Sequence, residues 1–128
     1  MAATRDIISL AKSAPEASPT PASLAVRGGD FIFVSGLTAV DLQSGKPVRG
    51  TTASETRVIL GNLKQLLEAA GSSIEKVVKV NVLLHSMLEA YMNEVYARFF
   101  PDPPPARTVC GARLPDGVKV IIECTALA

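Results

Sequence analysis

The sequence predicts an α+β domain in which two helices cover one face of a mixed β-sheet. Apolar residues recur at helical spacing over residues 51–70 and 88–99, and five short segments are rich in β-branched and apolar residues. The chain has 128 residues, of which 48% are hydrophobic and 20% charged, so it can bury one core. We therefore expect a single domain over residues 1–128.

The N-terminal residues 1–22 are expected to form an extended arm. Prolines recur in its second half, and proline biases both itself and the preceding residue away from the helical region. Strands are expected at 24–27 and 31–35, joined by the Gly-Gly-Asp turn at residues 28–30. Residues 36–50 are expected to form a long loop.

The first helix, over residues 51–70, begins with hydroxyl residues that can cap it. Glu55 lies in its first turn, where the helix dipole favours a carboxylate, and Gly71 is expected to end it. The next strand, residues 77–84, is apolar on both faces, which is typical of a central strand.

The second helix, over residues 88–99, ends at a run of prolines. Two further strands, at 106–113 and 118–127, are expected to pair across the Pro-Asp-Gly turn at 115–117. The predicted order is strand, strand, helix, strand, helix, strand, strand. Two helices cover only one face of a sheet that is apolar on both, which predicts an oligomer that buries the other face.

Composition disfavours several partners. A net charge of +1 without a basic stripe argues against nucleic acid. No apolar segment is long enough for a membrane span or signal peptide, so no membrane partner and a cytoplasmic location are expected. Cys110 and Cys124 both lie in apolar strands and are expected to be buried free thiols.

The chain has one histidine, His85, and no cluster of cysteines or carboxylates, so a standard zinc site is excluded. Phosphate-binding, dinucleotide-binding and nucleophile-elbow motifs are also absent from the sequence. His85 is interpreted as a polar residue at a strand end. The sequence thus gives no reason to expect a cofactor or metal.

Two charged residues stand out in the last strands. Glu123 interrupts an apolar run, where a carboxylate is costly unless it is paired or faces a cavity. Arg107 opens the preceding strand and comes roughly level with Glu123 if the two strands pair. One alternative is a buried ion pair that holds the hairpin or a subunit contact. The other is a guanidinium that binds a substrate carboxylate beside a carboxylate that positions water.

Five segments form a recognisable set of motifs in a fixed order: residues 31–36, 93–101, 105–108, 114–115 and 118–124. Together they resemble the motifs of the RidA family, also called YjgF or L-PSP endoribonuclease. The resemblance covers the chain from about residue 20 onward. It implies a chorismate-mutase-like fold, a homotrimer with clefts between subunits, and hydrolysis of enamines or imines such as 2-aminoacrylate to a 2-keto acid and ammonia.

The resemblance also implies roles for individual residues, without any cofactor. Arg107 occupies the position that binds the substrate carboxylate, and Glu123 matches the residue thought to position or activate water. The other matched positions are expected to line the substrate cleft: Ser35, Gly36, Asn93 and Cys110.

The chain departs from the family pattern at positions that bear on the substrate. Ala22 stands where the deaminase branch has a tyrosine, and Leu37 and Ile121 replace the usual glutamine and glutamate. Cys110 lies one position after the usual cysteine, which is Val109 here, and such a shift moves a strand residue to the other face. These changes favour a larger substrate, for which an aminomuconate is one candidate.

Three classes of function remain open on the sequence. The first is an enamine or imine deaminase, either general or specific to one catabolic step. The second is a non-catalytic trimer that binds small carboxylates. The third, an endoribonuclease as the older family name suggests, is disfavoured by the near-neutral charge and single histidine.

Overall fold

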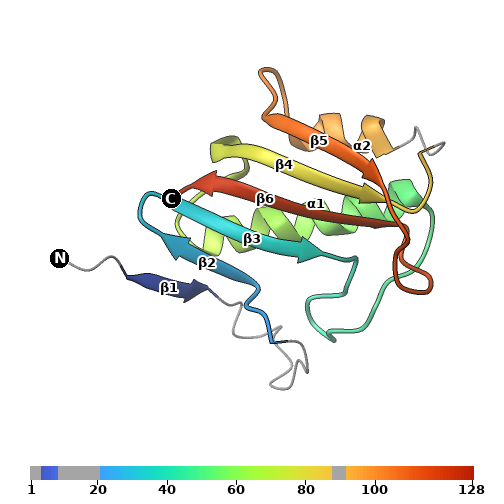
Figure 1. The fold of residues 1–128 in the computed structure, drawn as a ribbon, viewed down its shortest axis with the longest axis horizontal. Helices are drawn as coiled ribbons and strands as arrows, with labels where there is room; N and C mark the ends of the chain where they lie inside the picture. Colours follow the sequence, from blue (N-terminus) through green and yellow to red (C-terminus); the bar gives the residue numbers. More distant parts are fainter. Residues whose placement is uncertain (1–3, 9–20, 88–91) are drawn as a thin grey trace.

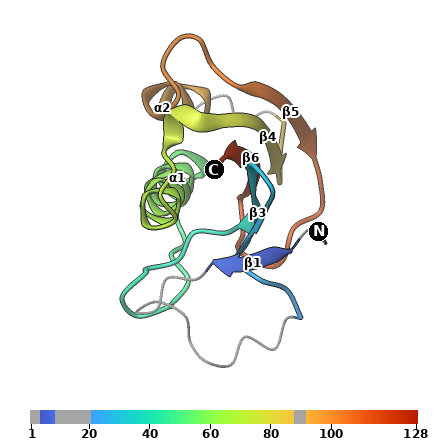
Figure 2. The ribbon, with the colours of Figure 1, turned by 90° about the vertical axis from the view of Figure 1, so that its left-hand side faces the viewer.

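The computed structural model describes residues 4–8, 21–87 and 92–128, which form a six-stranded sheet with both helices on one face (Figures 1 and 2). The strand order is β1-β2-β3-β6-β4-β5. The α+β class predicted from the sequence is therefore confirmed. The strands are β1 (Arg5–Ile8), β2 (Ala25–Gly28), β3 (Phe31–Leu37), β4 (Val77–Leu84), β5 (Ala106–Gly111) and β6 (Val120–Leu127). The helices are α1 (Thr52–Ala69), α2 (Met92–Phe99) and the short 3-10 helix η1 (Ile74–Lys76).

Helix α1 forms where the sequence predicts it. Thr51 is the N-cap, and its hydroxyl accepts a hydrogen bond from the Ser54 N–H at 3.1 Å. Gly71 follows the helix with a φ of 82°, a conformation that favours glycine. The first turn of α1 buries polar side chains, and from Ile59 onward its buried stripe is aliphatic: Ile59, Leu60, Leu63, Leu66 and Leu67.

The C-terminal strands differ from the prediction. The turn before β6 forms, with Gly117 at a φ of 81°, but β5 and β6 do not pair. Helix α2 carries the chain from β4 across to β5, which makes these two strands parallel neighbours. Strand β6 then inserts on the other side of β4 and pairs antiparallel with both β4 and β3. The predicted hairpin is wrong because β4 lies between its two strands.

The predicted arm contains a strand that the sequence analysis did not identify. Residues Arg5–Ile8 form β1, which pairs antiparallel with β2 at one edge of the sheet. The proline-rich part of the arm, residues 9–20, lies outside the described residues, as does the predicted start of the second helix at 88–91. The β2–β3 hairpin is confirmed, with Gly29 at a φ of 58° in its turn.

The two faces of the sheet differ in what covers them. The face toward α1 and α2 is the core, to which alternate residues of the central strand β6 contribute. On the opposite face, called here the open face, Phe31, Phe33 and Leu127 are 41%, 49% and 43% exposed. This face is only partly apolar, because the polar side chains of Asn81 and Glu123 also lie on it. The expectation of a face apolar throughout is therefore wrong in part.

Candidate functional site

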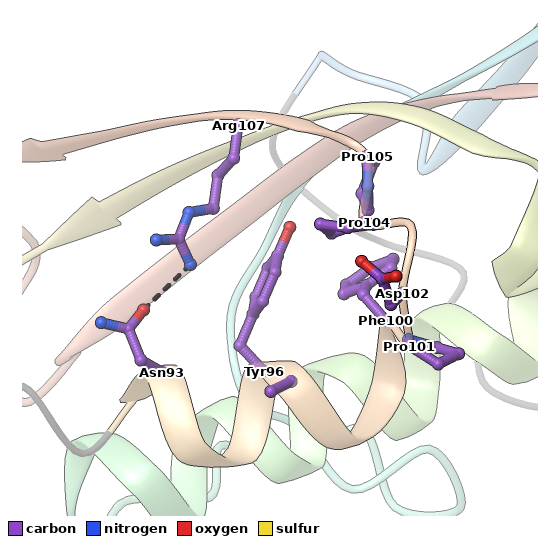
Figure 3. Close-up of a pocket in the computed structure, with 9 residues that line it drawn as sticks. Asn93, Tyr96, Phe100, Pro101, Asp102, Pro104, Pro105 and Arg107 are labelled. Atoms are coloured by element: carbon purple, nitrogen blue, oxygen red, sulfur yellow. Dashed lines mark hydrogen bonds between the residues drawn. The ribbon is translucent and has the colours of Figure 1, made fainter.

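Arg107 lies on the helix side of the sheet, at its β5 edge. In the parallel β4–β5 pair it stands opposite Val80, whose side chain belongs to the core. Its Nη1 donates to Asn93 Oδ1 of α2 at 2.9 Å, and its Cζ lies 4.7 Å from the centroid of the Tyr96 ring (Figure 3). The amide and the ring face both favour the guanidinium, so α2 holds this cation in place.

Tyr96 is the aromatic wall beside Arg107. Its ring centroid lies 4.6 Å from that of Phe100, and its hydroxyl is buried without a hydrogen-bond partner among the described residues. Burial raises the pKa of Tyr96, although the positive charge of Arg107 acts in the opposite direction. Tyr96 therefore acts as a neutral phenol that contributes shape and a ring face.

A cavity of about 460 Å³ opens beside Arg107 (Figure 3). Most of its wall is apolar or aromatic, formed by Tyr96, Phe100, Pro104 and Pro105, which come from α2 and the connection to β5. Among the described residues, the charged side chains that line it are Arg107 and Asp102. Such a cavity suits a ligand with one carboxylate, bound by Arg107, and an apolar group.

Glu123 belongs to a second polar cluster, on the open face. It stands opposite Asn81 in the β4–β6 pair and accepts a hydrogen bond from Asn81 Nδ2 at 2.8 Å. Nearby, Lys79 Nζ donates to Thr108 Oγ1 at 2.8 Å. Lys79, Asn81, Glu123 and Phe33 line a hollow of about 170 Å³. The Glu123 side chain is exposed, and one of its carboxylate oxygens has no protein donor among the described residues, which leaves it able to accept from water.

Ser35 and Gly36 lie on β3 at an irregularity beside Glu123. The β3–β6 register shifts between Val34, opposite Cys124, and Leu37, opposite Ile122. Ser35 Oγ donates to the carbonyl of Ser23 at 2.6 Å. A Cβ on Gly36 would lie 2.8 Å from Ile121 Cγ2, so only glycine permits this close approach.

The two cysteines occupy different environments. Both are free thiols, as predicted, but only Cys124 is buried, whereas Cys110 is exposed. Burial raises the pKa of the Cys124 thiol to about 12, and the neighbouring charge of Glu123 adds to this effect. Cys110 stands opposite Leu83, an odd number of residues from Arg107, and so lies on the open face.

The six residues singled out in the sequence thus form two groups. Arg107 and Asn93 meet on the helix side of the sheet, whereas the open face carries Glu123, Cys110 and the Ser35–Gly36 irregularity. Arg107 pairs with Val80 of β4, and Val80 pairs with Cys124 of β6. Arg107 is therefore level with Cys124 rather than with Glu123. Because neighbours along a strand point to opposite faces, one chain does not bring Arg107 and Glu123 together.

Sequence reasoning missed two residues that complete these groups. Tyr96 lies three residues after Asn93 and so on the same side of α2, which was a usable signal. Asn81 is an amide in the middle of an apolar strand, which also marks a side chain that needs a partner. The described residues include no group of three His, Cys, Asp or Glu side chains that could hold a metal ion. Within these same residues, no helix combines the length and apolar character needed to cross a bilayer.

Comparison with known proteins identifies the family. Residues 11–128 match the profile of the Endoribonuclease L-PSP family. The chain belongs to this family. A RutC family protein from Pyrococcus horikoshii is 43% identical over 108 residues, which cover 83% of this chain and 86% of that protein. Reactive Intermediate Deaminase A, chloroplastic, from Arabidopsis thaliana is 35% identical over 124 residues, or 95% of this chain and 65% of that protein.

A solved structure adds a ligand-bound relative. E. coli TdcF, crystallised with bound serine, is 32% identical and superposes with a TM-score of 0.84 over 96% of this chain and 98% of that one. The RidA resemblance predicted from the sequence is therefore confirmed. The names of the relatives include a chloroplast protein, so the cytoplasmic location stays a prediction.

Proposed function

We propose that this protein hydrolyses reactive enamines or imines of amino acids to 2-keto acids and ammonia, with Arg107 as the carboxylate-binding residue. The observation that carries the proposal is the guanidinium held by Asn93 and Tyr96 at the mouth of an apolar cavity. A relative named Reactive Intermediate Deaminase A and another solved with serine support the reaction and the amino-acid-like ligand.

The chemistry requires little beyond orientation and one group that handles protons. Arg107 would bind the carboxylate through two parallel hydrogen bonds and so fix the position of the C=N carbon. Glu123 would accept a proton from a water molecule as the water oxygen adds to that carbon. That proton passes to the nitrogen, which gives a carbinolamine. Glu123 would then transfer the hydroxyl proton to the departing nitrogen, so that the C–N bond breaks, the carbonyl forms and ammonia leaves.

The complete site requires a second copy of the chain. Arg107 and Glu123 lie on opposite faces of the sheet within one chain. The exposed Phe31, Phe33 and Leu127 make the open face suitable for burial in an oligomer. We propose a homotrimer in which the Arg107 cavity of one subunit meets the Glu123 cluster of its neighbour.

The Arg107 cavity favours one class of substrate. Its only described cation is Arg107, and its other charge, Asp102, would repel a second carboxylate. A dicarboxylate such as an aminomuconate therefore fits less well than a monocarboxylate with an apolar side chain. The imines of leucine or phenylalanine are such substrates, and they would use the wall formed by Tyr96, Phe100 and the prolines.

Turnover of imines generated in situ tests the proposal, with Arg107→Ala beside Arg113→Ala. Arg113 is an exposed arginine in the connection after β5, so Arg113→Ala removes the same charge as Arg107→Ala and serves as its matched control. We expect kcat/KM to fall by about two orders of magnitude in Arg107→Ala and to remain unchanged in Arg113→Ala. Carboxylate binding that depends on Arg107, without turnover of any imine, would instead support the non-catalytic alternative.

Mixing two inactive variants tests whether the site is shared between subunits. Arg107→Ala and Glu123→Gln each remove one half of it. After the two proteins are unfolded together and refolded, about a quarter of the clefts in a random trimer would have both wild-type residues if each comes from a different subunit. Recovery of activity supports the shared site. Activity that stays at the level of the separate variants, although mixed trimers form, contradicts it.

A further inference from the structure

Three basic side chains from three elements gather around a second cavity, on the opposite flank of α2 from Arg107. The cavity measures about 520 Å³ and lies between the start of α1 and α2. Arg57 of α1, Arg98 of α2 and Lys119 before β6 line it, against one carboxylate, Glu94. These cations are far apart in the sequence, where no basic cluster is visible. Across the described chain, neither arginine has an ion pair or hydrogen bond to another side chain.

The N-terminus of α1 contributes polar hydrogens to the same wall. The Thr51 hydroxyl caps the Ser54 N–H, whereas the N–H groups of Thr52 and Ala53 have no acceptor among the described residues. Thr52 is 1% exposed, and its buried Oγ1 likewise has no partner in the part of the chain that the structure describes. Because this oxygen is shielded from solvent, the anion-binding groups of the wall are the two backbone N–H groups rather than the hydroxyl.

The buried carboxylate of Glu55 does not serve as the acceptor at this cavity wall, because both of its oxygens accept hydrogen bonds elsewhere. Glu55 Oε2 accepts from the Gly50 N–H at 3.1 Å, and Oε1 accepts from the Lys119 N–H at 3.0 Å. Lys119 Nζ lies 3.8 Å from Glu55, which offsets part of the Lys119 charge. Among the described residues, Arg57 and Arg98 are therefore the principal cations of the cavity without an ion-pair partner. The cavity therefore has a net positive lining at the positive end of a helix dipole.

We propose that this cavity is a second ligand site, which binds the phosphate group of a small molecule. A phosphate dianion offers enough acceptor oxygens for two arginines and the helix N–H groups together, whereas a carboxylate offers two oxygens. The site shares no lining residue with the Arg107 cavity. It is independent of whether that cavity turns over an imine.

The test is a titration of the full-length protein with inorganic phosphate at low ionic strength, followed by calorimetry and by the amide resonances of Thr52 and Ala53. We expect saturable binding that shifts these two resonances and weakens as sodium chloride is added. Acetate should bind at least about tenfold more weakly, because it has fewer acceptors and less charge. Equal affinity for acetate, or phosphate binding without movement of these amides, overturns the proposal.

Variants locate the site. Arg57→Gln and Arg98→Gln should each weaken phosphate binding about three- to tenfold, and more in combination. Lys64→Gln is the matched control, since Lys64 is exposed two turns further along α1 and outside the cavity. An equal loss in Lys64→Gln would show that the effect is one of overall charge and would overturn the site. Melting temperatures of all variants confirm that each is folded.

Discussion

Two glutamates of this chain have opposite surroundings. Glu55 of α1 is fully buried and accepts hydrogen bonds from two backbone N–H groups, of Gly50 and Lys119, with the Lys119 ammonium 3.8 Å away. Glu123 of β6 is exposed on the open face, and its described hydrogen-bond donor is the Asn81 amide. The first carboxylate joins the loop before α1 to the start of β6, whereas the second retains oxygens that can accept from water.

The two glutamates show that apolar neighbours in the sequence do not determine whether a carboxylate is buried. Glu123 lies within an apolar run, yet strand alternation turns it away from the core. Glu55 lies among threonines and serines at a helix start, yet it is completely enclosed. A buried carboxylate with its hydrogen bonds satisfied has a structural role, and an exposed one beside a hollow remains available for chemistry.

The largest effect on stability is expected from Glu55→Ala. This change leaves two partly buried N–H groups without their acceptor and removes the partner of Lys119. We expect the free energy of unfolding to fall by about 3–5 kcal/mol, measured by urea denaturation. Glu68→Ala, an exposed glutamate of the same helix, should change it by less than about 0.5 kcal/mol. Similar losses in both variants would contradict the structural role of Glu55.

Alkaline pH should lower the free energy of unfolding through Cys124, which lies on the core side of β6. Cys124, beside Glu123 but on the core side, has a pKa of about 12 when folded against its usual 9.0. Above pH 9 the unfolded chain loses this proton while the folded chain keeps it, so stability falls between pH 9 and 12. At pH 11 the loss relative to pH 8 should be about 2–3 kcal/mol smaller in Cys124→Ala than in wild type. A Cys124→Ala profile that coincides with that of the wild type would contradict this role of the buried thiol.

Glu123→Gln should separate activity from stability. The substitution keeps the size of the side chain and can still accept from Asn81, so the free energy of unfolding should change by less than about 1 kcal/mol. If Glu123 is the group that takes a proton from water, kcat should fall by about two to four orders of magnitude while KM changes little. Steady-state kinetics with a saturating imine source measure both quantities. Unchanged kcat would remove Glu123 from the proposed mechanism.

The smallest effect is expected from Tyr96→Phe. The Tyr96 hydroxyl is buried without a partner among the described residues, so its removal breaks no hydrogen bond seen there. The ring that faces Arg107 remains. We expect a change in the free energy of unfolding of less than about 1 kcal/mol, of either sign, and near-normal turnover. A large loss of kcat would assign the phenol a chemical role that the geometry does not indicate.

Local patterns in the sequence were sufficient for most elements but not for their arrangement. Strand β4 and helix α1 lie where alternation, caps and a terminal glycine predicted them. The position of β6 between β3 and β4 depends on pairing between distant segments, which no local pattern encodes. The same limit applied to the site. Arg107, Asn93 and Glu123 were identified, but whether they share a face depended on a register that the sequence could not fix.

The order of the strands has a consequence for synthesis of the protein. Strand β6 is the last of the described strands to leave the ribosome, yet it lies between β3 and β4 and pairs with both. Until it emerges, the nascent chain has two separate parts of a sheet, each with an open hydrogen-bonding edge beside apolar side chains. The sheet therefore cannot be completed before β6 has emerged, and a truncation that removes only this eight-residue strand would delete the middle of the sheet rather than its margin.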